Sequence, residues 1–195
     1  MQVVIKGENV MKKLLILLAC TVLSSAAFAD DVSLEARFGD VAHSLAQGKV
    51  DSSEYDLAVS HDLVKGLSVG VELQDRQAQG TVTGIGAANV GFALSVVGLK
   101  IKPYGEVGHE SAASESTNFW GAGVNASYPV VGPVSVEAGY RHRAGFSDAG
   151  LMKEDRVTGG LAWSFTKKDA LAVSYQHYTG TLVQDVVGVT LRHSF

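Results

Sequence analysis

The strongest constraint on the fold is a two-residue alternation of apolar and polar side chains that continues to the last residue. In the closing stretch DVVGVTLRHSF, the residues Val187, Val189, Leu191 and Phe195 fall on one side of an extended strand, and small or charged residues fall on the other. Successive side chains of a strand point to opposite faces, so one face is apolar and the other is polar. A chain end exposed to water gains little from being apolar, so something must cover this face.

The same alternation recurs along the chain and defines ten candidate strands. Their apolar rows begin at Val32, Tyr55, Leu67, Val90, Ile101, Trp120, Val134, Val157, Leu171 and Val187. Segments of about 9–11 residues match the length of a tilted strand that crosses a bilayer. Pro103 weakens the strand prediction for the segment that begins at Ile101, because proline has no N–H to donate to a strand ladder. If this segment and one neighbour are not strands, the barrel has eight strands instead of ten.

The connections between these segments alternate in length. Short connections at 62–66, 97–98, 129–133 and 166–169 alternate with longer polar ones at 40–52, 75–88, 109–117, 144–155 and 178–184. This rhythm predicts an all-β fold, an antiparallel up-and-down transmembrane β-barrel with both termini at the end that carries the short turns. A soluble barrel or sandwich, with the apolar row inside, is the alternative.

The beginning of the chain predicts export. Met11, Lys12 and Lys13 precede an apolar run to Leu23, and a small-residue cleavage site ends at Ala29, as in a secretory signal peptide. We therefore divide the chain into an upstream extension with a cleaved signal peptide, 1–29, and a single barrel domain, 30–195.

Removing residues 1–29 lowers the formal net charge from −4 to −6, which argues against a nucleic-acid partner. It also removes Cys20, the only cysteine, so the mature domain is expected to have no disulfide. A lipoprotein box ending at Cys20 is the weaker alternative, since it would leave a very short apolar core.

Aromatic residues cluster near both ends of the candidate strands. We predict two belts at the membrane interfaces, made of Phe38, Trp120, Tyr128, Tyr140, Trp163, Phe165 and Tyr175.

The polar rows combine glycines with charges of both signs, which suits the interior of a barrel. The charges predicted to line the lumen are Glu35, Arg37, Glu72, Lys102, Glu106, Glu137, Arg141, Arg143, Arg156 and Arg192. An unpaired buried charge is costly, so these groups should pair. The glycines among them favour some open cross-section.

Together, the signal peptide, the alternating last strand and the terminal phenylalanine resemble the small outer-membrane β-barrel proteins of Gram-negative bacteria, the OmpA/OmpX-like and small porin-like group. The resemblance rests on Val187, Val189, Leu191 and Phe195, whereas His193 stands where that group more often has an aromatic residue such as tyrosine. It implies insertion among outer-membrane lipids and recognition of this last strand by the barrel-assembly machinery.

No residue pattern in the sequence supports catalytic chemistry. The stretch Gly66 to Gly70 matches the G-x-S-x-G pattern of serine hydrolases, but no helix follows it, and the histidines lack metal-ligand spacing. We therefore expect no enzyme activity, no metal and no cofactor.

The sequence favours a narrow porin-like channel for ions or small polar solutes, with the lumen charges setting selectivity. The alternative is a closed structural barrel, or an adhesin-type or receptor-type barrel whose connections 40–52, 75–88 and 144–155 bind a partner.

Overall fold

The computed structural model describes residues 30–42, 50–78, 81–112, 115–146, 153–180 and 183–195, so the predicted signal peptide lies outside the described residues. The strands are β1 (Asp31–Ala42), β2 (Val50–Val64), β3 (Leu67–Ala78), β4 (Thr81–Phe92), β5 (Leu94–Val96), β6 (Leu99–Ala112), β7 (Glu115–Val131), β8 (Val134–Gly145), β9 (Lys153–Ser164), β10 (Asp169–Gly180) and β11 (Val183–Ser194).

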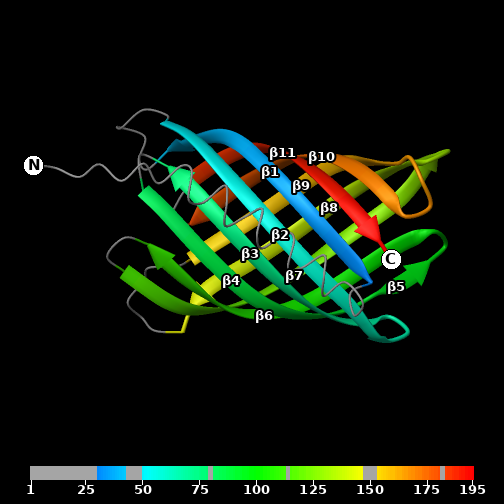
Figure 1. Cartoon of the computed structure of the whole chain (residues 1–195), viewed down its shortest axis with the longest axis horizontal. Coiled ribbons are helices and arrows are strands. Elements are labelled where there is room, and N and C mark those ends of the chain that lie inside the picture. Colours follow the sequence, from blue (N-terminus) through cyan, green and yellow to red (C-terminus); the bar gives the residue numbers. More distant parts are fainter. Residues whose placement is uncertain (1–29, 43–49, 79–80, 113–114, 147–152, 181–182) are drawn as a thin grey trace, which may run out of the picture.

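The strands close into one antiparallel barrel (Figure 1). Consecutive strands pair with each other except β4 and β5, and two further pairings complete the ring: β1 with β11, where Leu34 lies opposite Leu191, and β4 with β6, where Ala88 lies opposite Val107. The short strand β5 pairs with β6 where β4 stops, so the two together make one wall element. The barrel therefore has ten strands in up-and-down order, as the alternation predicted.

Pro103 marks the place where β4 gives way to β5. The β4–β6 ladder ends at the pair Gly91 and Tyr104, and the β5–β6 ladder resumes at Leu94 and Ile101. Proline has no N–H to donate, so a break in the ladder opposite Pro103 costs little. The segment is nevertheless a full barrel strand, because β6 pairs along its length with β7.

The two ends of the barrel differ in their connections. Tight turns at 65–66, 97–98 and 132–133 lie at the same end as both termini of the barrel domain, where the Phe195 amide donates to the Asp30 carbonyl over 2.9 Å. One of these turns places Val97 at a φ of 48°, followed by Gly98 at 83°. A valine in the left-handed region is strained, because its branched side chain crowds the backbone.

The predicted long connections at 75–88, 109–117 and 178–184 are wrong. Strand β3 extends to Ala78 and β4 starts at Thr81, so most of 75–88 is paired strand, and the other two segments are likewise mostly strand. The ladder continues here, but both faces of β3 become polar, with Asp75 and Gln77 alternating with Gln74 and Arg76. A strand that is polar on both faces has no period-two signal.

The apolar row lies on the outer face of the barrel. Leu73, Val136 and Leu191 are 39 %, 45 % and 51 % exposed, whereas Arg141 is 1 % exposed. This is the reverse of a soluble barrel, in which the apolar row would fill the interior. Among the described residues, no helix has the length and apolar character needed to cross a membrane.

Candidate functional site

A network of charged and polar side chains fills the middle of the barrel, and we call it the ion-pair plug. Its side chains come from β1, β2, β3, β6, β8, β9 and β10. The plug consists of Glu35, Arg37, Glu54, Asp56, Glu72, Gln74, Arg76, Glu106, Arg141, Arg143, Glu154, Arg156, Ser174, Gln176 and Tyr178.

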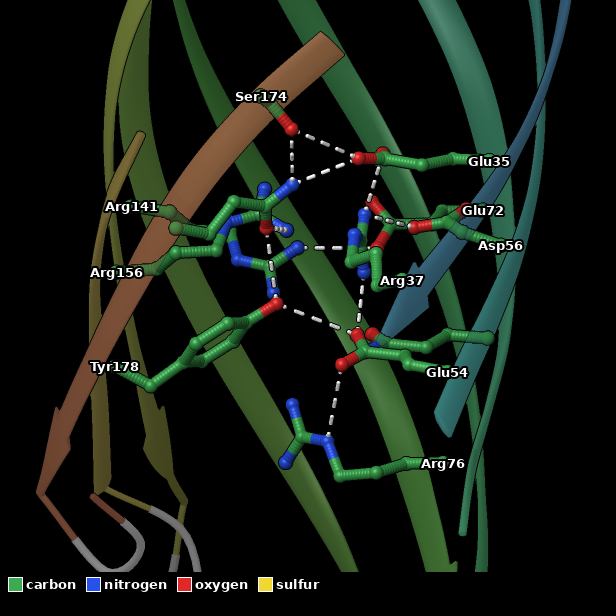
Figure 2. Close-up of polar contacts among 12 residues, drawn as sticks. Glu35, Arg37, Glu54, Asp56, Glu72, Arg76, Arg141, Arg156, Ser174 and Tyr178 are labelled. Atoms are coloured by element: carbon green, nitrogen blue, oxygen red, sulfur yellow. Dashed lines mark hydrogen bonds and ion pairs between the residues drawn. The ribbon is translucent and has the colours of Figure 1, made fainter. Parts of the chain in front are cut away.

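One half of the plug is organised around Arg37, which meets three carboxylates (Figure 2). Its guanidinium lies 2.8 Å from Glu35 and 2.9 Å from Asp56, and it also donates to Glu54. These partners lie on β1 and on the adjacent strand β2, where Arg37 is directly opposite Glu54 in the register. The alternation of side chains and the register of two adjacent strands together form this cluster.

The other half is organised around two arginines of β8. Arg143 binds Glu106 in a bidentate manner, with Nε and Nη2 at 2.7 and 2.9 Å from the two carboxylate oxygens. Arg141 lies 3.0 Å from Glu72 and 3.1 Å from Glu154. Because β8 and β3 are not neighbours in the sheet, the contact from Arg141 to Glu72 crosses the lumen.

Arg76 joins the two halves. It lies 3.5 Å from Glu54 of the paired strand β2 and 2.9 Å from Glu154 of β9, which does not pair with β3, so the second contact crosses the lumen. The result is one continuous chain of ion pairs across the interior. Its order is Arg37, Glu54, Arg76, Glu154, Arg141, Glu72, Arg143 and Glu106.

Neutral side chains of β10 add hydrogen bonds to two of these carboxylates. Gln176 donates to Glu35 over 2.7 Å, and the Tyr178 hydroxyl donates to Glu54 over 3.3 Å. The Arg76 guanidinium lies 5.2 Å from the centre of the Tyr178 ring, within the range of a cation–π contact. Figure 2 shows Tyr178 and Arg141 reaching from one wall toward Arg37 and Glu54 on the other.

The interior is filled at the level of the plug. Glu54 and Arg143 have no exposed surface, and Arg141 and Tyr178 are each 1 % exposed. Side chains lining a water-filled passage would be exposed to that water. The conformation described is therefore closed at this level.

The inward glycines do not open the lumen here, contrary to the expectation from sequence. A Cβ on Gly121 would lie 2.5 Å from a carboxylate oxygen of Glu106, and one on Gly188 would overlap Glu35. Each glycine thus makes room for a long side chain of a neighbouring strand. An open section would have needed small residues on adjacent strands at the same level.

The remaining predicted lumen charges lie outside the chain of ion pairs. Arg192 and Glu137 pair with each other across the lumen toward the short-turn end, where their side chains are 41 % and 21 % exposed. Arg156 donates to Gln176 over 3.4 Å. Lys102 is half-buried on β6, and no carboxylate of the described chain forms an ion pair with it.

The predicted interface aromatics and the terminal strand lie on the outer face. Phe38, Trp120, Tyr128, Tyr140, Trp163, Phe165 and Tyr175 are between 41 % and 54 % exposed. Val187, Val189, Leu191 and Phe195 are between 44 % and 51 % exposed.

The sequence analysis missed several members of the plug, notably Arg76, Glu154 and Tyr178, which fall in stretches that read as connections rather than strands. Glu54 and Asp56 lie on the polar row beside Tyr55, as the alternation indicated. Continuing the in-and-out alternation past the predicted strand ends would have placed Arg76 and Tyr178 inside. Arg76 follows Glu72 and Gln74 on the inward row of β3, and Tyr178 follows Ser174 and Gln176 on that of β10.

No protein-family model matches the sequence, and neither does any curated protein compared with it. Solved structures do resemble the barrel. The KdgM porin is 18 % identical, with 84 % of this chain and 99 % of that one covered and a TM-score of 0.50. The β domain of the Bordetella autotransporter BrkA is 12 % identical, with 85 % and 100 % covered and a TM-score of 0.53.

The fold is that of bacterial outer-membrane β-barrels. At such low identity the likeness concerns the fold alone, and one of these proteins is a porin whereas the other is a domain of an autotransporter. Any function must therefore be argued from the ion-pair plug and the surfaces of this chain.

Proposed function

We propose that this protein is exported by its signal peptide, inserted in the bacterial outer membrane by the barrel-assembly machinery, and acts as a narrow channel for ions or small polar solutes. In this proposal the ion-pair plug is the constriction, and the described conformation is the closed one. Neither enzyme activity nor a cofactor nor a nucleic-acid partner forms part of it.

The observation that carries the proposal is that plug carboxylates have more than one arginine within reach. Glu72 is shared by Arg141 and Arg143, at 3.0 and 3.2 Å, and Glu154 is shared by Arg76 and Arg141, at 2.9 and 3.1 Å. Leaving a buried carboxylate unpaired is what makes the rearrangement of buried charges costly. When one arginine moves away from Glu72 or Glu154, the other arginine still pairs with that carboxylate.

The composition of the plug supports the same function. A purely structural filling has no need of charges, because replacing a buried ion pair with well-packed apolar residues is often neutral or stabilising. Rings and clusters of charged side chains, by contrast, set the selectivity of narrow pores. A plug of ion pairs therefore fits a gated passage better than a permanent seal.

A closed barrel that binds a partner with its surface is the second candidate. The observation that favours it is the complete burial of Arg143 and Glu54, which leaves neither side chain in contact with water. In this case the ion pairs only satisfy one another.

Conductance of the purified protein in a planar bilayer separates the two candidates. The parent protein should show discrete openings, and Arg141→Ala should make them larger or more frequent because it removes a side chain that crosses the lumen. Glu137→Gln should change ion selectivity. Val136→Leu, its outward-facing neighbour, is the matched control and should change neither.

Silence of the parent protein over a wide range of salt and voltage would overturn the channel proposal, even if Arg141→Ala conducts. That result would instead support the closed barrel.

A further inference from the structure

A groove of about 550 Å³ lies on the outer face of the barrel, away from the ion-pair plug. It is lined by Gly86, Val107, Gly108, His109, Asn118 and Phe146. These residues belong to β4, β6, β7 and the position after β8, toward the barrel end opposite the termini. A volume of this size is within the range of ligand sites, about 300–1,000 Å³.

The floor of the groove exists because β4 presents glycines to the outside. A Cβ on Gly84 would meet nothing within 4 Å, and one on Gly86 would meet only Leu73, at 3.7 Å. The neighbouring rows carry full side chains, including the exposed Val107 of β6. The outer surface is therefore indented along β4; its walls are apolar beside Ala88, which lies between Val71 and Val107, and polar beside Gly84, which lies between Asp75 and Ser111.

The upper end of the groove is polar. His109 Nδ1 lies 2.9 Å from the Asn118 side-chain oxygen, and this pair lies two residues farther along the strands than the pair of Val107 and Trp120. The contact uses Nδ1 and Oδ1 only, so His109 Nε2 and the Asn118 amide nitrogen remain able to hydrogen-bond. Glu110, the next residue of β6, has the opposite parity and faces the lumen.

His109 differs from the other histidines that the structure describes. All of them face outward and pair with a residue of an adjacent strand, but the partner of each of the others is an aspartate: the pairs are His61 with Asp30, His142 with Asp155, His177 with Asp185, and His193 with Asp169. Only at His109 is the partner a neutral amide. An anionic group could approach this pair without meeting a carboxylate hydrogen-bonded to the same ring.

We propose that the groove binds one membrane lipid, whose phosphate headgroup hydrogen-bonds to His109 and Asn118 beside Gly86 and whose acyl chain runs from Gly86 over Ala88, between Val71 and Val107. The groove is continuous with the apolar outer face, and its polar end lies just beyond Trp120, at the level where interfacial aromatics meet headgroups. The inference rests on membrane insertion, as proposed above, but not on conduction.

Quenching of Trp120 by brominated lipid tests this directly. The chain has two tryptophans, so Trp163→Phe leaves Trp120, which is paired with Val107 at the edge of the groove, as the only one. This variant is placed in phosphatidylcholine vesicles containing a small fraction of phosphatidylglycerol brominated on its acyl chains, or the same fraction of brominated phosphatidylcholine. We expect phosphatidylglycerol to be enriched about tenfold near Trp120, the effect of one hydrogen bond to a charged group.

Two variants in this background locate the lipid. Gly86→Leu fills the floor and should abolish the enrichment, whereas Gly159→Leu, at an outward glycine of β9 where a Cβ would meet nothing within 4 Å, should leave it unchanged. Asn118→Ala should reduce the preference for phosphatidylglycerol about tenfold while phosphatidylcholine still quenches.

Unchanged enrichment in both Gly86→Leu and Asn118→Ala would overturn the proposal. Loss of the preference on adding inorganic phosphate, with no effect of Gly86→Leu, would show a free-anion site instead of a lipid site and would also overturn it. If no brominated lipid quenches Trp120 at all, membrane insertion itself fails, which is distinct from failure of the groove. Because a poorly folded variant would also lose enrichment, each is first checked for the gel mobility of the folded barrel.

Discussion

Replacing Arg141 with methionine should strongly destabilise the barrel. The guanidinium is 1 % exposed and lies 3.0 Å from Glu72 and 3.1 Å from Glu154. Removing one partner of a buried ion pair typically costs about 3–5 kcal/mol, because the other charge is left uncompensated. Here Arg143 still reaches Glu72 and Arg76 still reaches Glu154, so we expect a loss near the lower end, about 3 kcal/mol.

The matched control is Arg192→Met. Its partner Glu137 is also on another wall of the barrel, but the two side chains are 41 % and 21 % exposed. Exposed ion pairs contribute about 0–1 kcal/mol, so this variant should lose no more than that. The two variants remove the same chemical group and differ chiefly in burial.

Equilibrium unfolding by urea in lipid vesicles, followed by tryptophan fluorescence, measures both losses. The denaturant midpoint should fall while the slope stays constant, since the surface exposed on unfolding barely changes. Adding Glu72→Gln to Arg141→Met completes a double-mutant cycle, in which residues of one network show a coupling of about 0.5–3 kcal/mol. A loss for Arg141→Met no larger than that for Arg192→Met, together with no coupling to Glu72, would refute the ion-pair plug as described.

Three further predictions concern packing, a turn and assembly. Gly121→Ala should cost about 1–3 kcal/mol of unfolding free energy, because the new Cβ lies 2.5 Å from Glu106 and 2.8 Å from a backbone oxygen, whereas Gly159→Ala, with nothing within 4 Å, should cost less than about 1 kcal/mol in the same urea assay. Val97→Asn should stabilise the barrel by about 1 kcal/mol, because asparagine tolerates the left-handed φ of 48°; an unchanged midpoint would mean that this turn is not strained. Deleting Phe195 should lower the yield of folded, heat-modifiable barrel in cells without preventing refolding in detergent; a normal cellular yield would argue against its role as an assembly signal.

The feature of the fold that could be predicted best was which side chains of each strand face outward and which face inward. Leu73, Val136 and Leu191 lie outside and Arg141 lies inside, as their alternation indicated, because the direction of a side chain on a strand depends only on its own position in the pleat. Strand ends were predicted less well. Beyond Gln74 the strand β3 continues with polar residues on both faces, so hydrogen bonds hold the ladder together where no hydrophobic contrast marks it.

The sequence by itself favoured a ten-stranded closed barrel over an eight-stranded one, with an apolar exterior and a charged interior, because all three follow from a local repeat along each strand. Only the tertiary structure decided which arginine meets which carboxylate, that the lumen is filled at the plug, and that Gly86 and His109 share a groove. Those contacts join strands that do not pair in sequence order, such as β8 with β3 and β3 with β9, and they depend on how far each strand is staggered when the sheet closes. Stagger is a property of the whole ring, so no single strand encodes it.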